Sequence, residues 1–185
     1  GLPPESRGPR LRELVETLRA TGEHDQALER AKELLALEPT DVQTLEYVED
    51  ELRRREDRRE LRDLLLVATR LPGAPVELKK RRLREVAELD EEHLADAEGA
   101  IEAYGALLAL DPADRDARTK LGSLLERLGR WDALVAHLEQ ESLGLVDPDA
   151  KAALLFRLAI LHRDRRDDPV SARMALRNLR QLRPD

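Results

Sequence analysis

The sequence of 185 residues predicts an all-α protein in which five antiparallel helix pairs stack into an α-solenoid. The composition is dominated by Leu, Ala, Arg and Glu and is only 2% aromatic, which favours helices over strands. Apolar residues recur three or four positions apart, which is the spacing of an amphipathic helix. This pattern recurs five times along the chain, as expected of a helical-repeat protein. The 41% hydrophobic content at regular intervals argues against disorder, despite 38% charged residues.

The clearest internal repeat is an amphipathic helix that ends in a leucine, with a proline two residues later. Three segments carry it in the same register, namely residues 27–39, 100–112 and 172–184. Two weaker copies are centred on Leu61 and Leu134. The first positions of the five copies, called here the repeat anchors, are 34, 39, 34 and 38 residues apart: Ala27, Leu61, Ala100, Leu134 and Ala172. The alternation of short and long spacings indicates that a pair of repeats was duplicated.

Each anchor helix is preceded by a second helix of similar length, so the five repeats predict ten helices. We expect these near residues 10–20, 24–37, 41–55, 57–71, 76–93, 97–110, 114–128, 131–143, 149–165 and 170–182. Residues 1–7 are expected to be an N-terminal tail, and residues 8–185 a single solenoid domain. Its repeats are expected at about 8–41, 42–75, 76–113, 114–147 and 148–185.

Individual residues support these boundaries. Gly22 and Gly129 lie where the first helix of a repeat turns into the second, and glycine can adopt the left-handed conformation that ends a helix. Asp41, Asp111 and Asp114 lie where an aspartate can cap the following helix.

A large residue followed by a small one marks the first helix of several repeats. The pairs are Leu121–Gly122, Val86–Ala87 and Leu158–Ala159, and the small residue allows the two helices of a repeat to approach closely. The anchor Ala100 should be buried where the helices of the third repeat cross.

These residues resemble the tetratricopeptide repeat family. The resemblance rests on Leu121-Gly122-x2-Leu125, the small anchors, Tyr104 four residues after its anchor, and the closing prolines, and it extends from Gly8 to Asp185. It implies a right-handed superhelix whose first helices line a concave groove. The sequence departs from the family pattern at Glu49, which occupies the usual small position, and repeats three and five carry at least one extra residue between their helices.

Composition and motifs give little support to catalysis. There is no cysteine, no glycine-rich phosphate loop and no nucleophile motif, and we expect a protein that is not an enzyme and has no cofactor or metal. The four histidines show no metal-ligand spacing and are expected at helix ends or on the surface: His24, His93, His137 and His162. The apolar stretches are too short to span a membrane. The net charge of −7 disfavours bulk nucleic-acid binding.

Two sets of residues are candidates for partner contact in the groove. The first is basic and comprises Arg53, Arg54, Arg81 and Arg84, which could bind an acidic stretch of a partner or could simply pair with Glu88, Glu91 and Glu92. The second is apolar and comprises Ala153, Phe156 and Ile160, which occupy positions held by Arg81, Arg84 and Glu88 in the third repeat. A helix that is apolar all round is usually buried, so packing inside the solenoid or in a dimer is the alternative.

We therefore expect a protein–protein interaction scaffold that binds a peptide, helix or domain of another protein. The alternatives are a spacer or self-association module within a longer multi-repeat protein, and an arginine-lined phosphate or RNA binder. With only five lysines among 32 basic residues, the composition suggests a bacterial source, and a cytoplasmic rather than periplasmic location is expected. Gly1 leaves open that the native N-terminus lies outside this sequence.

Overall fold

The computed structural model describes residues 7–182, and within this range the chain forms ten α-helices, one π-helical segment and no strand. The helices are α1 (Arg7–Thr21), α2 (His24–Leu37), α3 (Val42–Arg54), α4 (Arg58–Arg70), α5 (Val76–Glu88), η2 (Leu89–His93), α6 (Ala97–Leu110), α7 (Arg115–Arg127), α8 (Trp131–Gly144), α9 (Pro148–Asp164) and α10 (Pro169–Leu182). With η2 counted as the continuation of α5, every boundary lies within three residues of its predicted position. The ten-helix prediction is confirmed, and the predicted tail falls almost wholly outside the described residues.

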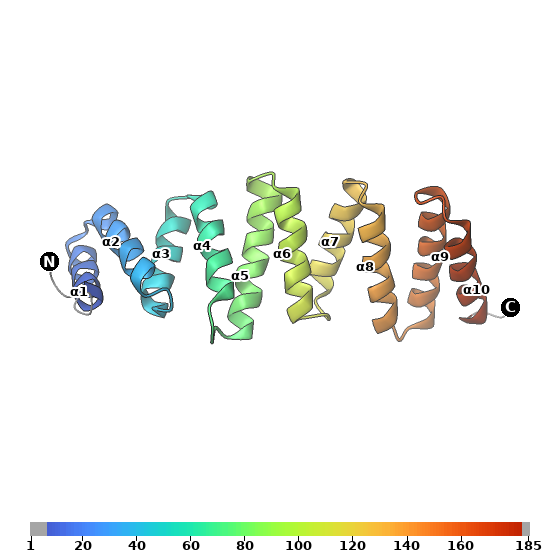
Figure 1. The fold of residues 1–185 in the computed structure, drawn as a ribbon, viewed down its shortest axis with the longest axis horizontal. Coiled ribbons are helices and arrows are strands. Elements are labelled where there is room, and N and C mark those ends of the chain that lie inside the picture. The colour runs from blue at the N-terminus through green and yellow to red at the C-terminus, as the bar shows by residue number, and fades with distance from the viewer. Residues whose placement is uncertain (1–6, 183–185) are drawn as a thin grey trace. The chain divides into compact units, whose positions relative to one another are not determined.

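The chain divides into two compact units, Gly1–Ala113 and Asp114–Asp185. In the first unit α1 to α6 form three consecutive pairs, and in the second unit α7 to α10 form two (Figure 1). Within each unit, a helix packs mainly against the helices that precede and follow it in the chain. This dependence on neighbours is what distinguishes a helical repeat from a closed bundle. The expectation of one continuous domain over residues 8–185 stays a prediction.

A left-handed residue occurs in the turn between the two helices of every repeat. Gly22 and Gly129 have φ of +80° and +66° and confirm the predicted turns. The corresponding residues of the other repeats are not glycine, yet Glu56, Ala95 and Asp167 have φ of 56°, 54° and 49°. All five residues precede their repeat anchor by five positions, so the turns confirm the register of the repeats.

The repeat anchors form the centre of each helix pair. Ala27, Ala100 and Leu134 are completely buried, and Leu61 and Ala172 are nearly so. The prediction that Ala100 is buried is therefore confirmed. Because a methyl group or leucine side chain at this position fills the contact between two helices, the pattern of small and large anchors sets how closely each pair packs.

Aspartates start several of the helices. The side chain of Asp41 accepts a hydrogen bond from the backbone N–H of Thr44 at 3.0 Å, and Asp114 accepts one from Ala117 at 3.0 Å. Both are N-caps, as predicted. The prediction for Asp111 is wrong, because this residue follows the end of α6 and its carboxylate is 2.7 Å from the Lys80 ammonium.

Most of the extra length of repeats three and five lies inside their first helices. In repeat three, α5 continues without a break into the π-helical segment η2, and in repeat five α9 extends over 17 residues. A π-helical turn accommodates one additional residue without ending a helix. The expectation that these residues lengthen the connection between the helices is therefore wrong for repeat three. In repeat five the connection, residues 165–168, is longer than residues 55–57 or 128–130 of repeats two and four, as expected.

The π-helical segment also places an acid in the core. Asp90 is buried and accepts a hydrogen bond from Arg62 Nε of α4 at 2.8 Å, while Arg62 Nη2 donates to Asp96 at 2.8 Å. Burial raises the pKa of Asp90, and the ion pair with Arg62 opposes that shift. The pair fixes α4 against the irregular end of the α5–η2 helix.

A second buried ion pair explains the unusual glutamate of repeat two. Glu49 of α3 and Arg82 of α5 have side chains that are only 1% and 2% exposed. Glu49 Oε1 accepts a hydrogen bond from Arg82 Nε at 2.8 Å and is 2.7 Å from Arg82 Nη2. The family's small residue is thus replaced by a charged residue whose partner comes from the next repeat.

Candidate protein-interaction surfaces

The predicted apolar stripe lies on the exposed side of α9. Phe156 and Ile160 are 52% and 36% exposed, and Ala153 is also exposed, whereas Leu155, Leu158 and Ala159 on the opposite side are buried. The separation is what the 3.6-residue period dictates for a helix that packs on one side. The stripe is therefore not part of the core of its own unit, and its role in binding stays a prediction.

Beside this stripe the second unit has a cleft of 290 Å³. Phe156, Ile160 and Leu161 of α9 form its apolar side, and Trp131 at the start of α8 lies across from them. We call Ala153, Phe156, Ile160, Trp131 and Arg165 the α9 surface. Trp131 was not among the residues predicted for this site, because it belongs to the second helix of the preceding repeat and no local pattern connects it with α9.

The charges around the cleft are only partly compensated. Arg157 Nη2 donates to Glu126 at 2.6 Å, and Arg163 binds both oxygens of Asp164 at 2.5 and 2.9 Å. Those hydrogen bonds lower the pKa of Asp164. Arg165 instead places its guanidinium 4.8 Å from the centre of the Trp131 ring, a cation–π contact. Within residues 7–182 Arg165 has no carboxylate within ion-pair distance.

The exposed side of α10 carries apolar residues as well as Arg173 and Arg180. Met174 and Leu176 are 62% and 45% exposed. Leucine at position 176 corresponds to Ala31 of the first repeat, which is fully buried. The exposed side of α10 therefore offers a second, smaller apolar surface.

The predicted basic residues of repeat two are engaged within the chain. Arg53 donates to both oxygens of Glu85 at 2.7 and 2.8 Å and lies 3.3 Å from Glu49. The hydrogen bonds from Arg53 to Glu85 are the main reason that the pKa of Arg53 is raised. Arg54 is bound by Glu51 one turn earlier in α3. Neither Glu85 nor Glu51 is among the glutamates predicted as partners. Glu85 belongs to the next repeat, and Glu51 precedes Arg54 in the same helix.

The predicted basic residues of repeat three differ in their exposure to solvent. Arg81 is exposed, whereas Arg84 is half-buried. Lys80 is the main cause of the lowered pKa of Asp111, and the nearby Arg84 contributes. Arg82, which follows Arg81, was not among the predicted site residues, yet it is the buried partner of Glu49.

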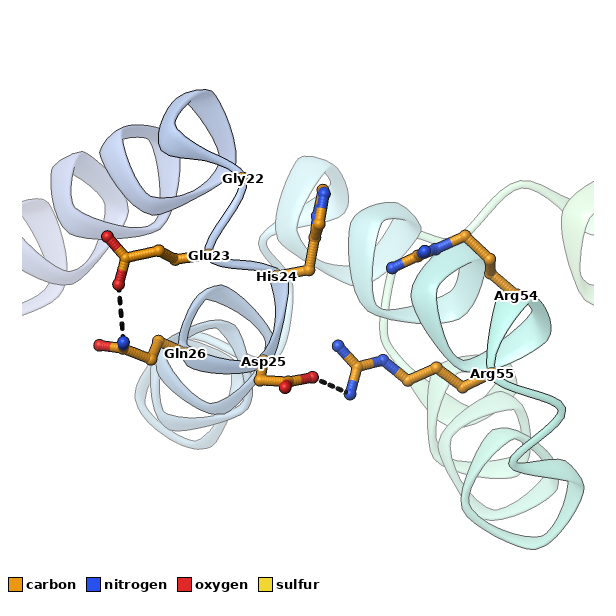
Figure 2. A pocket seen from close by; sticks show the side chains of 7 residues that line it. All are labelled: Gly22, Glu23, His24, Asp25, Gln26, Arg54 and Arg55. Carbon is orange, nitrogen blue, oxygen red and sulfur yellow. Dashed lines mark hydrogen bonds and ion pairs between the residues drawn. The ribbon is translucent and has the colours of Figure 1, made fainter.

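A polar hollow of 510 Å³ lies at the turn ends of the first two repeats. Figure 2 shows that its lining residues come from the turn before α2, from the first turn of α2 and from the C-terminal end of α3, with Asp25 directed toward Arg55. The Arg55 Nη1 atom is 2.7 Å from Asp25, and its Nε and Nη2 atoms donate to Glu51 at 2.9 and 2.8 Å. The acids and bases that line the hollow thus largely neutralise one another.

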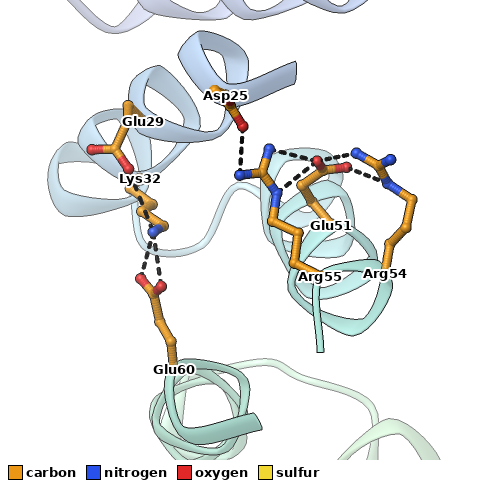
Figure 3. A network of polar contacts seen from close by, with 7 residues as sticks. All are labelled: Asp25, Glu29, Lys32, Glu51, Arg54, Arg55 and Glu60. Atoms are coloured by element: carbon orange, nitrogen blue, oxygen red, sulfur yellow. Dashed lines mark hydrogen bonds and ion pairs between the residues drawn. The ribbon is translucent and has the colours of Figure 1, made fainter. Parts of the chain in front are cut away.

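Two separate groups of ion pairs connect α2 with the second repeat. Figure 3 shows Lys32 of α2 between Glu29 and Glu60, and Glu51 of α3 between two arginines. Lys32 Nζ is 2.7 Å from Glu60 of α4. Arg54 is the main cause of the lowered pKa of Glu51, and Arg55 adds to it. The contacts hold repeat one to repeat two, and they indicate a structural role for Arg54 and Arg55.

His162 lies in the last turn of α9, at a helix end as expected, whereas His137 lies in the middle of α8 and departs from the prediction. His162 is buried, and its Nδ1 atom is 3.2 Å from Arg166 Nη1. His137 is half-buried, and its Nε2 atom donates to the carbonyl oxygen of Arg118 at 2.9 Å. Burial is the main reason that the pKa of His137 is lowered. In the part of the chain that the structure describes, no three His, Asp or Glu side chains form a group that could hold a metal ion.

The arrangement of turns and anchors defines the class of protein. Antiparallel pairs follow one another, a left-handed turn residue precedes each buried anchor by five positions, and neighbouring helices make the main contacts. This is a helix-pair repeat fold of the tetratricopeptide type. No helix of the described residues is long and apolar enough to cross a membrane.

Solved structures similar to this chain include proteins described as tetratricopeptide-repeat proteins. A MamA protein matches 97% of this chain and 93% of its own, with 15% identity and a TM-score of 0.46. YrrB, described as a TPR protein with an unusual peptide-binding site, matches 94% and 84%, with 17% identity and a TM-score of 0.44. A tetratricopeptide repeat protein from Parabacteroides merdae matches 97% and 68%, with 18% identity and a TM-score of 0.44. No protein-family model and no curated protein matches the sequence.

Proposed function

We propose that this chain is a protein–protein interaction scaffold that binds a peptide, helix or domain of another protein in the groove of its first helices, with the α9 surface as the main contact. The protein acts by binding and not by catalysis. The observation that carries the proposal is the exposure of Phe156, which is 52%. It is the only phenylalanine of the chain, and it lines one cleft with the only tryptophan.

The composition of the α9 surface supports contact with protein. Aromatic side chains and arginine are enriched at the centres of protein interfaces, where they supply most of the binding energy. Trp131, Phe156 and Arg165 bring these residue types together around one cleft. The fold itself does not require them, because the third repeat has Arg81, Arg84 and Glu88 at the positions of the apolar stripe.

A pair of substitutions separates binding from folding. Phe156→Ser with Ile160→Glu removes the apolar stripe, and Val170→Ser with Met174→Glu makes the same chemical change on exposed positions of α10. Both variants should have the same midpoint of urea unfolding as the wild type, since each of the four replaced side chains is at least one third exposed. Proteins captured from an extract of the source organism would be identified, purified and tested again by direct titration.

We expect the α9 variant to lose at least tenfold in affinity for the purified partner, about 1.4 kcal/mol, and the α10 variant to bind normally. If the α9 variant fails to fold while association is unchanged, the stripe belongs to the core and the proposal is wrong. Equal losses in both variants would also contradict it.

Self-association is the second candidate function, and the exposed Met174 and Leu176 of α10 favour it. In that case sedimentation velocity should show a dimer or larger assembly of the wild type that the α10 variant reduces to a monomer. A phosphate or RNA binder lined by arginine has less support, because Arg53 and Arg54 already bind glutamates. Binding to phosphate or RNA would be indicated by an affinity that falls steeply as the salt concentration rises.

A further inference from the structure

The first unit contains a larger cleft, of 620 Å³, between α4 and α6. Leu66 of α4, Leu83 of α5 and Ala103 and Ala106 of α6 form its apolar floor and walls. Leu83 and Ala103 are buried beneath it, whereas Ala106 is exposed along its side. We call this cleft the α4–α6 groove. It lies in a different unit from the α9 surface and shares no residue with it.

The two ends of the groove carry opposite charge. Arg70, at the end of α4, and Lys79, near the start of α5, lie at one end. Glu98 and Glu102, in the first half of α6, lie at the other, where Arg62 also lines the groove but is paired with Asp90 and Asp96. Neither Arg70 nor Lys79 has a carboxylate within ion-pair distance among residues 7–182. The positive end therefore differs from the Arg53 and Arg55 contacts, in which every guanidinium binds an acid of the same chain.

The length of the groove sets the size of what it can hold. Its α6 side extends from Glu98 to Leu110, a length of roughly 18 Å at 1.5 Å per residue. That is about three turns of a helix. An extended chain of the same length would need its backbone polar groups satisfied, and the apolar floor of the groove offers no partners for them.

We infer that the α4–α6 groove binds an amphipathic helix of a partner protein, with acidic residues in its first turn and basic residues in its last. The acidic turn lies against Arg70 and Lys79, and the basic turn lies against Glu98 and Glu102. This distribution is also the one that stabilises a helix through its own dipole. Because Arg70 marks the end of α4, the bound helix runs antiparallel to α4 and α6, in the direction of α5 (Figure 1).

The charges that surround the groove support one orientation. A helix that entered in the opposite direction would put its basic turn beside Arg70 and Lys79, where like charges repel. Leucine side chains three and four residues apart on the bound helix would reach Leu66 and Leu83, and the small Ala103 and Ala106 leave room for them. Apolar contact provides the affinity, and the charged ends provide the direction.

The test selects the ligand from a displayed library of peptides of about 16 residues, which is long enough for the groove, with the whole chain as bait. Synthetic copies of the enriched peptides are then titrated by fluorescence anisotropy. One variant, Arg70→Glu with Lys79→Glu, reverses the positive end, and Ala106→Trp fills the groove without changing charge. The control variant, Leu143→Glu with Val146→Ser, changes exposed positions of the other unit that belong to neither proposed surface. The variant Phe156→Ser with Ile160→Glu is measured separately as the test of the α9 surface.

We expect enriched peptides to carry acids before, and bases after, a leucine stripe of helical spacing. Their affinity should fall at least tenfold with either groove variant and less than twofold with the control. Peptides whose acids are changed to lysine should recover binding to the charge-reversed variant.

Enriched peptides without this order of charges would overturn the inference. Peptide affinities that are unchanged by both groove variants would also overturn it. So would a failure to enrich any peptide. If the groove variants change only the mass of the protein in sedimentation, the groove holds a second copy of the chain, and the partner helix is wrong. Loss of binding in the variant Phe156→Ser with Ile160→Glu alone would support the α9 surface and refute the groove, so the two proposals fail separately.

Discussion

Removing Glu49 should be far more damaging than removing Glu49 together with Arg82. The Arg82 side chain is 2% exposed, and Glu49 is the acid that binds it, through contacts of 2.7 and 2.8 Å. Glu49→Ala therefore leaves a guanidinium in the core without a carboxylate. Breaking a buried pair in this way costs about 3–5 kcal/mol, because the remaining charge was desolvated and has no compensation.

The double variant Glu49→Ala with Arg82→Met removes both charges and keeps most of the apolar volume. Replacing a buried ion pair by apolar residues is often neutral or stabilising, by about 1–4 kcal/mol. Alanine is also the small residue that the equivalent position has in other repeats, such as Ala87 and Ala159. We expect the double variant to be within about 1 kcal/mol of the wild type or more stable.

Urea unfolding measures both effects. Circular dichroism follows the helices of the whole chain, while the fluorescence of Trp131, the only tryptophan, reports on the second unit. Glu49→Ala should lower the midpoint seen by circular dichroism. A loss below about 1 kcal/mol for the single variant, or an equal loss for the double variant, would show that the pair does not stabilise repeat two against repeat three.

Three further predictions concern local structure. Ala100→Leu should overpack a fully buried position and cost about 1–3 kcal/mol; an unchanged thermal midpoint would contradict the assigned register. Ala95→Gly should stabilise the protein by about 1 kcal/mol, because Ala95 has φ of 54°, and urea midpoints below the wild type would refute this. Burial lowers the pKa of His137 in the folded protein. Below the ordinary histidine pKa of about 6.5, His137 therefore binds more protons in the unfolded chain than in the folded one. Stability should be complete above that pH and decrease as the pH falls through the folded pKa, and a His137→Gln variant that shows the same decrease would refute the assignment.

Periodic features of this fold could be predicted from the sequence. The ten helices and the buried anchor Ala100 depend on local spacing, because each helix needs only one apolar side directed to its neighbours. The exposure of Phe156 and Ile160 follows from the same period once Leu158 is assigned to the packed side. Repeats in one chain provide internal comparisons, and these reveal where a residue type is not required by packing.

Contacts between repeats could not be predicted in the same way. The pair of Glu49 with Arg82 joins residues 33 positions apart, and neither residue shows locally that it is buried. Trp131 contributes to the α9 surface from another helix, for the same reason. The π-helical segment around Asp90 was missed because an extra residue in a helix and an extra residue in a turn give the same repeat spacing.

The central claim is that the α9 surface contacts another protein. The most direct measurement places a photoreactive phenylalanine analogue at position 156 and, as a control, at position 174, which is 62% exposed on α10. After irradiation in the source organism, the position 156 protein should form one dominant cross-link to a different protein, and Ile160→Glu should abolish it. The proposed scaffold function would be contradicted if both positions cross-linked to the same protein in equal yield. It would also be contradicted if position 156 cross-linked only to a second copy of the chain.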